Sequence, residues 1–223
     1  MAGSPVANRV GLAVAGLLTV SLLAGCGGES SDASPVSGVS VHDGDGLAHG
    51  VVLPEPYAAS SVPLRDTSGR AERLTAKTDE PLRLVFFGYT NCPDICQVVM
   101  ASIASAMSRL DEQQRSQVSM TFVTTDPARD TTAVLRRYLD RFDPGFGGLT
   151  GPLPDIVRVG ETLGVSIEKG QKLPSGGYDV AHGTQIVGLL PDGRAPYVWT
   201  EGTSPGDLAA DISSILDGKV STR

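Results

Sequence analysis

Residues 82–96 read LRLVFFGYTNCPDIC, a largely apolar run that leads directly into two closely spaced cysteines. The first eight residues have the length of a strand, and their nearly unbroken hydrophobicity is typical of a strand buried on both faces. An apolar repeat of helical period continues from there to Leu110, and Pro93 suits the first helical position. A buried strand that turns directly into a helix predicts the centre of an α/β domain.

The segments that follow extend this alternation of strands and helices. Residues 117–125 alternate as a strand does, and residues 133–142 have a helical pattern, which gives the order βαβα. Later in the chain we expect a helix over 153–163, strands over 184–190 and 195–200 joined by a turn at 191–193, and a closing helix over 205–216. The sequence therefore predicts a mixed sheet flanked by helices.

The folded domain is expected to begin at Leu47, where the composition changes. Short apolar stretches at 51–53 and 62–64 predict two strands of an N-terminal β-hairpin, and residues 66–69 predict a turn. We assign 47–223 to one α/β domain, since a chain of 223 residues has room for one medium domain with extensions. The net charge of −7 has the wrong sign for gripping a phosphate backbone, which argues against a nucleic-acid partner.

Residues 1–25 carry the features of an export signal. Arg9 precedes fifteen apolar and small residues, 10–24, which are too few for a typical membrane-spanning helix. The ending LAGC, residues 23–26, resembles the lipobox of bacterial lipoproteins, in which the cysteine is acylated and becomes the first residue after cleavage. We therefore expect a lipid anchor on Cys26, a flexible tether over 26–46, and a domain on the extracytoplasmic side of the cell membrane. An uncleaved signal anchor is the alternative.

The other two cysteines, Cys92 and Cys96, lie at the junction of the central strand and its helix. Both thiols are expected to be unusually acidic, because amide donors and the helix dipole favour the thiolate at a helix N-terminus. A spacing of four residues places both sulfurs on one helical face, which suits two ligands of one metal ion better than an unstrained disulfide. Soft thiolates select Cu(I) or Zn(II), and an imidazole would complete such a site.

His182 is the histidine best placed to supply that imidazole. His42 and His49 lie in or beside the tether, whereas His182 lies in a Gly-rich loop, 175–183, just before a predicted strand. Loops at the ends of a sheet are where α/β proteins collect their functional residues. From the residues alone, an ordinary loop histidine and a third metal ligand stay equally open.

The run from Phe87 to Cys96 closely resembles the hallmark of the Sco/SenC proteins, thioredoxin-like copper chaperones for cytochrome c oxidase assembly. Residues 125–131, TDPARDT, and the stretch 178–194 resemble two further blocks of that family, so the resemblance covers about residues 50–217. It implies a three-layer thioredoxin-like fold. It also implies that copper, as Cu(I) or Cu(II), is bound by Cys92, Cys96 and His182.

The resemblance also bears on the surroundings of the imidazole and on partners. Ala181 stands before His182 where many members have an acid, so Asp126 and Asp179 are candidates for the group that fixes the imidazole tautomer. The implied function is that of a membrane-tethered chaperone, which accepts copper from a donor protein and delivers it to the binuclear copper site of an oxidase subunit.

A thiol:disulfide oxidoreductase is the alternative function. In it, Cys92 and Cys96 would act as a redox pair that keeps the cysteines of the oxidase copper site reduced. The usual redox pair of the thioredoxin fold has two intervening residues, and the three found here argue mildly against this reading.

Overall fold

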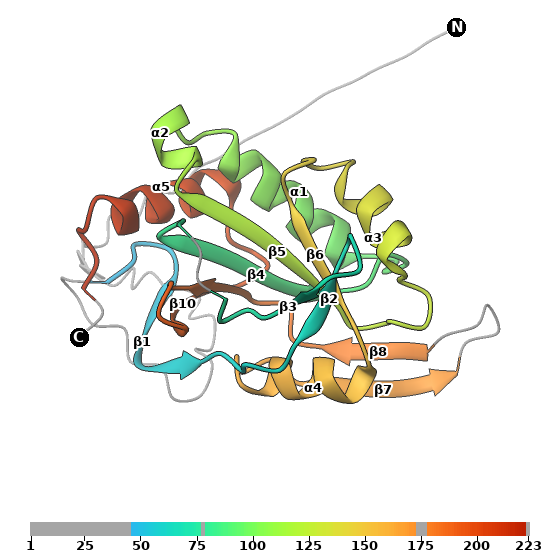
Figure 1. Cartoon of the computed structure of the whole chain (residues 1–223). Helices are drawn as coiled ribbons and strands as arrows, with labels where there is room; N and C mark the ends of the chain where they lie inside the picture. The colour runs from blue at the N-terminus through green and yellow to red at the C-terminus, as the bar shows by residue number, and fades with distance from the viewer. Residues whose placement is uncertain (1–45, 77–78, 173–177, 222–223) are drawn as a thin grey trace, which may run out of the picture. The chain divides into compact units, whose positions relative to one another are not determined.

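An eight-stranded mixed sheet forms the centre of the fold (Figure 1). The computed structural model describes residues 46–76, 79–172 and 178–221. The strands of the sheet lie in the order β1-β10-β9-β4-β5-β6-β2-β3. Their bounds are Val51–Ala58 (β1), Leu64–Asp66 (β2), Ala71–Glu72 (β3), Leu82–Gly88 (β4), Val118–Thr124 (β5), Gly147–Thr150 (β6), Ile186–Leu189 (β9) and Arg194–Trp199 (β10).

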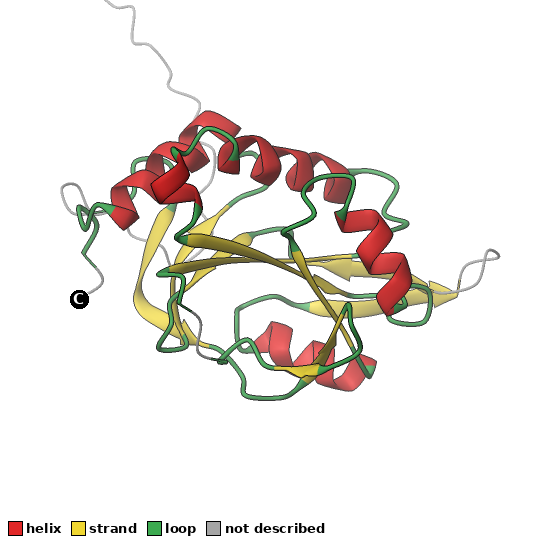
Figure 2. Cartoon of the chain, turned by 45° about the horizontal axis from the view of Figure 1, so that its top comes forward, coloured by secondary structure: helices red, strands yellow, loops and turns green. Residues whose placement is uncertain are grey.

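The centre of the sheet is parallel and its flanks are antiparallel. β4, β5 and β6 run parallel to one another, whereas the other neighbouring strands pair antiparallel. The described helices are Ile95–Met107 (α1), Glu112–Arg115 (α2), Thr132–Leu139 (α3), Leu153–Glu161 (α4) and Pro205–Leu216 (α5). β4 connects to β5 through α1, and β5 connects to β6 through α3. Because both crossovers run in the same direction along the sheet and are right-handed, both helices lie on one face. Figures 1 and 2 show α1, α3 and α5 on one face of the sheet and α4 on the other.

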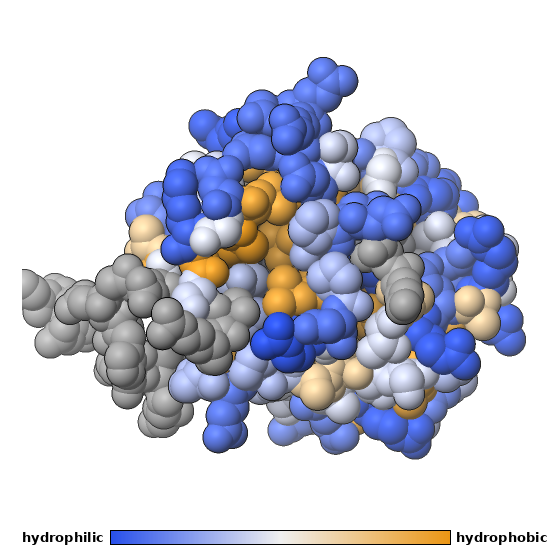
Figure 3. Space-filling model, turned by 60° about the vertical axis from the view of Figure 1, so that its left-hand side comes forward, coloured by the Kyte–Doolittle hydropathy of each residue, from blue (hydrophilic) through white to orange (hydrophobic). Residues whose placement is uncertain are grey.

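This three-layer arrangement buries the predicted central strand completely. Every residue of β4 is buried, as its nearly unbroken hydrophobicity predicts. The one charged residue in it, Arg83, has its Nη1 3.7 Å from Glu72 Oε1 and also donates to the Leu74 carbonyl. On the face seen in Figure 3, most side chains are hydrophilic, and apolar areas lie between them. Among the described residues, Val98 of α1 is the large apolar side chain that is exposed.

The first strands differ from the predicted N-terminal hairpin. β1 does not pair with β2; it pairs antiparallel with β10 at one edge of the sheet, whereas β2 lies near the other edge between β3 and β6. The turn predicted at 66–69 is confirmed, but it joins β2 to β3. Asp66 accepts hydrogen bonds there from the amides of Ser68 and Arg70, and Gly69 has a φ of +85°. The hairpin therefore exists one strand later than predicted.

The remaining predicted elements agree closely with the structure. The strands expected over 117–125, 184–190 and 195–200 are β5, β9 and β10, and the three later helices are α3, α4 and α5. The sequence reading missed α2, β6 and a separate two-stranded sheet of Ile167–Lys172 (β7) and Tyr178–His182 (β8). Within the described residues, no helix has the length and apolar character to cross a membrane. The predicted signal peptide and most of the tether, including Cys26, lie outside the described residues.

Candidate metal centre

The two cysteines lie on the turn that joins β4 to α1. Helix α1 begins at Ile95, two residues later than predicted, so Cys92 lies in the turn and Cys96 in the first helical turn. The Cys92 amide donates to the Tyr89 carbonyl at 3.1 Å, which closes the turn. The Cys96 amide in turn points to Cys92 Sγ at 3.4 Å, so the first thiol caps the start of the helix. Both cysteines are buried and free.

Burial overrides the expected acidity of the second thiol. The prediction that both thiols are unusually acidic is wrong for Cys96, because burial raises the pKa of its thiol, and the hydrogen bond with the Cys92 side chain raises it further. The Cys96 side chain lies so close to the sheet that a Cβ added at Gly88 would come within 3.1 Å of its sulfur. Burial removes the hydration of a thiolate, and this loss of stabilisation is larger than the stabilisation that the helix N-terminus provides. The metal-free Cys96 is therefore a thiol.

The third predicted ligand stands beside this thiol. His182 is the last residue of β8, and its Nε2 lies 3.9 Å from Cys96 Sγ. Its Nδ1 lies 2.9 Å from the Gly183 carbonyl oxygen, which accepts a hydrogen bond only if Nδ1 carries the proton. Burial lowers the pKa of His182, so the ring is neutral and the Nε2 lone pair faces the sulfur. This is the tautomer that a metal ligand needs.

The separation of these atoms fits a shared metal ion. A sulfur and a nitrogen bound to one ion at about 2.3 and 2.0 Å lie about 3.5 to 3.7 Å apart in tetrahedral or trigonal geometry. The 3.9 Å between Cys96 Sγ and His182 Nε2 is close to that value. Within the described part of the chain, no three His, Cys, Asp or Glu side chains already form a closed metal site. Thiols and an imidazole are the ligand types that a soft ion prefers.

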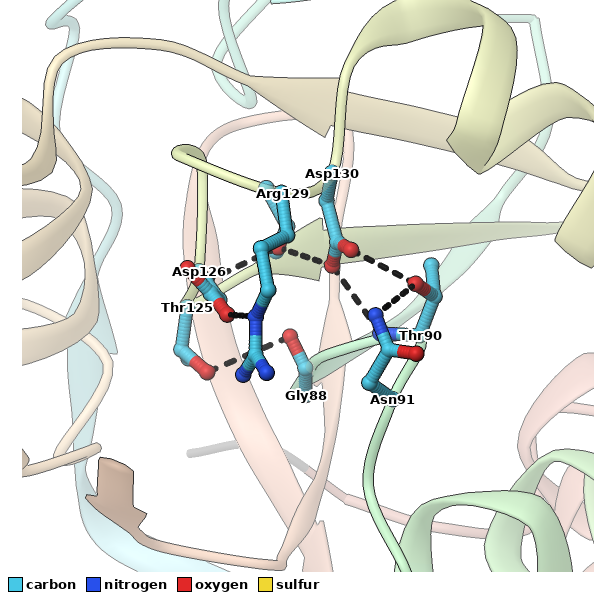
Figure 4. Close-up of polar contacts among 8 residues, drawn as sticks. Gly88, Thr90, Asn91, Thr125, Asp126, Arg129 and Asp130 are labelled. Atoms are coloured by element: carbon cyan, nitrogen blue, oxygen red, sulfur yellow. Dashed lines mark hydrogen bonds and ion pairs between the residues drawn. The ribbon is translucent and has the colours of Figure 1, made fainter. Parts of the chain in front are cut away.

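One of the two candidate acids for the imidazole, Asp126, lies away from the ring. Asp126 is buried, and its carboxylate pairs with Arg129 (Figure 4). The Arg129 guanidinium lies over the ring of Tyr89 at 5.8 Å, and the Tyr89 ring meets the His182 ring edge-on, with centroids 6.1 Å apart. Asp126 is thus two side chains away from the imidazole, whose Nδ1 partner is the Gly183 carbonyl. The side chain of Asp179 lies outside what the structure describes.

One buried acid near the site was assigned no role by the sequence reading. Asp130 is fully buried between β5 and α3, and its carboxylate accepts hydrogen bonds from Thr90, which lies on the cysteine turn. Asp130 falls in the same TDPARDT stretch as Asp126, but no local pattern distinguishes a buried aspartate from an exposed one. Its contact with a residue forty positions earlier in the chain could be found only in three dimensions.

The fold and the site together define a thioredoxin-like domain with a dithiol at a strand-to-helix turn and an imidazole beside it. The SCO1/SenC family model matches residues 62–217, most of the domain. The chain therefore belongs to the SCO1/SenC family, as its motifs predict.

Individual relatives agree with this assignment. The chain is 37% identical over 111 residues to the protein "SCO2 homolog, mitochondrial" of Bos taurus. The matched stretch covers 49% of this chain and 42% of that protein. It spans about half the length of the curated relatives it matches. Among solved structures, copper-bound ScoI of Bradyrhizobium japonicum matches with a TM-score of 0.62 and 29% identity, covering 70% of this chain and 98% of that one. Apo Sco1 of Thermus thermophilus matches with a TM-score of 0.67 and 28% identity, and the match covers 76% of this chain and 99% of that one.

Proposed function

We propose that this protein is a membrane-tethered copper chaperone that holds Cu(I) between Cys92, Cys96 and His182. The observation that carries the proposal is the position of the His182 imidazole, whose Nε2 lies 3.9 Å from Cys96 Sγ beside a free dithiol. Two sulfurs and one imidazole nitrogen form a soft donor set that favours Cu(I). The relative from Bradyrhizobium japonicum, described as ScoI with copper bound, supports the choice of metal.

In this proposal copper is a cargo, and the residues of the chain control its uptake and release. The raised pKa of Cys96 keeps that thiol protonated until a cation displaces the proton, so loading releases protons and copper affinity rises with pH. The Gly183 carbonyl holds the imidazole with its lone pair toward the sulfur. A site built from three ligands leaves a coordination position through which an acceptor's ligand can begin exchange.

The proposed acceptor is the binuclear copper site of a cytochrome c oxidase subunit, with a separate donor protein supplying the metal. A lipid anchor on Cys26 and the tether over 26–46 would confine the domain to the extracytoplasmic face of the membrane. Such confinement raises the effective concentration of the carrier near a membrane-bound target.

The dithiol also supports a second candidate function, that of a thiol:disulfide oxidoreductase. The observation in its favour is the position of Cys92 outside α1, because a disulfide to Cys96 then requires no distortion of a regular helix. In this role one thiolate would attack a disulfide of the oxidase subunit, and the second cysteine would resolve the mixed disulfide.

An anaerobic Cu(I) titration of the reduced, detergent-solubilised chain against a chromophoric chelator tests the chaperone proposal. We expect stoichiometric binding by the wild-type protein. His182→Ala should weaken it at least about tenfold, because even the loss of an outer-shell partner of a metal ligand has that effect. The dithiol/disulfide equilibrium with glutathione should change little in the same variant. Equal Cu(I) binding by both proteins would remove His182 from the ligand set, and wild-type binding no tighter than that of an unstructured dithiol would shift the weight to the oxidoreductase.

Cys26→Ser tests the proposed anchor. We expect the variant to leave the membrane fraction or to accumulate as an unprocessed precursor, because the acylated thiol is missing. Cell fractionation with detection of the folded domain measures both outcomes. A fully processed variant that stays in the membrane fraction would contradict the lipid anchor.

A further inference from the structure

A buried carboxylate ties the cysteine turn to the end of β5. Asp130 Oδ2 accepts hydrogen bonds from the Thr90 amide at 2.9 Å and from the Thr124 hydroxyl at 2.6 Å. Its Oδ1 accepts from the Thr90 hydroxyl at 2.6 Å. Figure 4 shows the carboxylate facing Thr90 across the gap between the two loops. Three donors thus converge on one side chain, and two of them come from the cysteine turn.

The same pair of loops is joined at a second point, just before the turn. The Gly88 carbonyl accepts from the Thr125 amide at 2.7 Å and from the Thr125 hydroxyl at 3.3 Å. The backbone on either side of Tyr89 is therefore held by the loop over 124–130. Cys92 follows Thr90 by two residues, and its own amide bonds back to Tyr89. Its sulfur position thus depends on where Thr90 is held.

Burying the Asp130 carboxyl group costs desolvation free energy, which an apolar side chain at this position would not require. Asp130 is fully buried, and burial raises its pKa, although hydrogen bonds from Thr124 and Thr90 offset part of that effect. A buried ionisable group is tolerated only when its hydrogen bonds are satisfied. Perturbed acids of this kind concentrate at functional sites. The geometry gives the reason here, because what Asp130 fixes is the turn that bears a proposed ligand.

We propose that Asp130 is a positioning residue of the dithiol, whose carboxylate holds Thr90 and thereby sets where Cys92 stands relative to Cys96. This rests on the proposed function for the identity of the ligands. Without the link, the turn keeps its sequence but loses its fixed position, and Cys92 must be ordered each time a metal binds or a disulfide forms. Both Cu(I) affinity and the tendency to form the disulfide then fall.

Two threonine variants separate this role from general stability. Thr90→Val and Thr124→Val each remove one 2.6 Å hydroxyl bond to the same carboxylate, but only Thr90 lies on the cysteine turn. Thr124 also accepts from the Asp126 amide at 3.0 Å, so its loss is at least as damaging to the fold. Urea unfolding of each full-length variant measures that structural effect.

We expect both variants to lose stability and only Thr90→Val to change the site. Its Cu(I) affinity should fall about tenfold, the scale seen when a partner that orients a metal ligand is removed. In a glutathione buffer, the dithiol and oxidised glutathione exchange to the intramolecular disulfide and two reduced glutathiones, and this equilibrium should also shift toward the dithiol. If Thr124→Val changes either quantity as much as Thr90→Val does, or if Thr90→Val changes neither, the positioning role is overturned.

A conservative variant of the acid itself provides a rescue. Asp130→Asn keeps an oxygen for the Thr90 amide and the Thr124 hydroxyl, and its amide nitrogen can donate to a reoriented Thr90 hydroxyl. It should retain Cu(I) affinity and the glutathione equilibrium far better than Asp130→Ala, and equal losses in the two would contradict the proposal. If the wild-type protein binds no Cu(I), the proposed function fails, while the glutathione equilibrium still tests the positioning role.

Discussion

Gly88 of β4 packs closely against Cys96 Sγ. We therefore expect a larger side chain at this position to lower the stability of the fold. A Cβ built there would lie 3.1 Å from Cys96 Sγ and 3.1 Å from Phe122 Cε2, whereas relaxed contacts between such atoms lie near 3.5 to 4.0 Å. Overpacking of this kind costs about 1–3 kcal/mol, and the reduced freedom of the unfolded chain returns about 0.4–1 kcal/mol. We expect Gly88→Ala to lower the free energy of unfolding by about 1–2 kcal/mol.

A second glycine in the same sheet supplies the matched control. A Cβ at Gly147 of β6 would meet its nearest neighbours, Met120 O and Thr121 Oγ1, at 3.4 and 3.6 Å, which is ordinary contact. Gly147→Ala should therefore be neutral or slightly stabilising. Urea denaturation of the reduced, metal-free proteins measures both, and the melting temperature of Gly88→Ala should fall by about 2–8 °C. If the two variants are equally stable, the tight packing of the Cys96 sulfur against β4 is refuted.

Two further predictions concern acids at other positions. The Asp211 carboxylate accepts from the Ala48 amide at 3.0 Å and from Trp199 Nε1 at 2.9 Å, so Asp211→Ala should lower the free energy of unfolding by about 3 kcal/mol and change the fluorescence of the single tryptophan; unchanged values for both would refute the contacts. Burial would raise the pKa of Asp66, but hydrogen bonds from its turn lower it to about 2. The stability it contributes is present above its unfolded pKa of 3.8 and is lost as the pH falls toward 2, so the stability difference between wild type and Asp66→Asn should shrink over that window. A difference that stays constant with pH would contradict this.

The elements that sequence reasoning located are those whose signals are local. β4 is readable because a strand buried on both faces needs no polar alternation, and the hairpin turn at 66–69 because Asp and Gly have specific roles there. The partner of β1 was misassigned, since β1 pairs with β10 and its own residues do not encode that choice. The start of α1 was placed two residues early because Pro93 fits a first helical turn, while the observed turn is held by its bond to Tyr89.

In the candidate site, too, local features could be predicted from the sequence and tertiary contacts could not. The spacing of Cys92 and Cys96 is visible in the sequence, but His182 lies 86 residues from Cys96, and its place beside the sulfur follows from the pairing of β7 with β8, which no pattern indicated. Asp130 could not be singled out from the sequence either, because its proposed role depends on a contact with Thr90 between two loops. Residue types and short spacings thus identify the candidates, and tertiary contacts decide which of them meet.

The predicted acidity of the Cys96 thiol was wrong for a reason that bears on function. A helix N-terminus favours a thiolate by a limited amount, and for Cys96 the loss of hydration is larger, so burial decides the sign of the pKa shift. Attack on a disulfide requires a thiolate, so a buried and protonated Cys96 is a poor nucleophile at neutral pH. A metal ion, in contrast, can displace the proton when it binds the sulfur. The burial of Cys96 therefore argues against this cysteine as the attacking thiol of an oxidoreductase, and a reactivity of Cys96 toward alkylating agents equal to that of an exposed cysteine would contradict this.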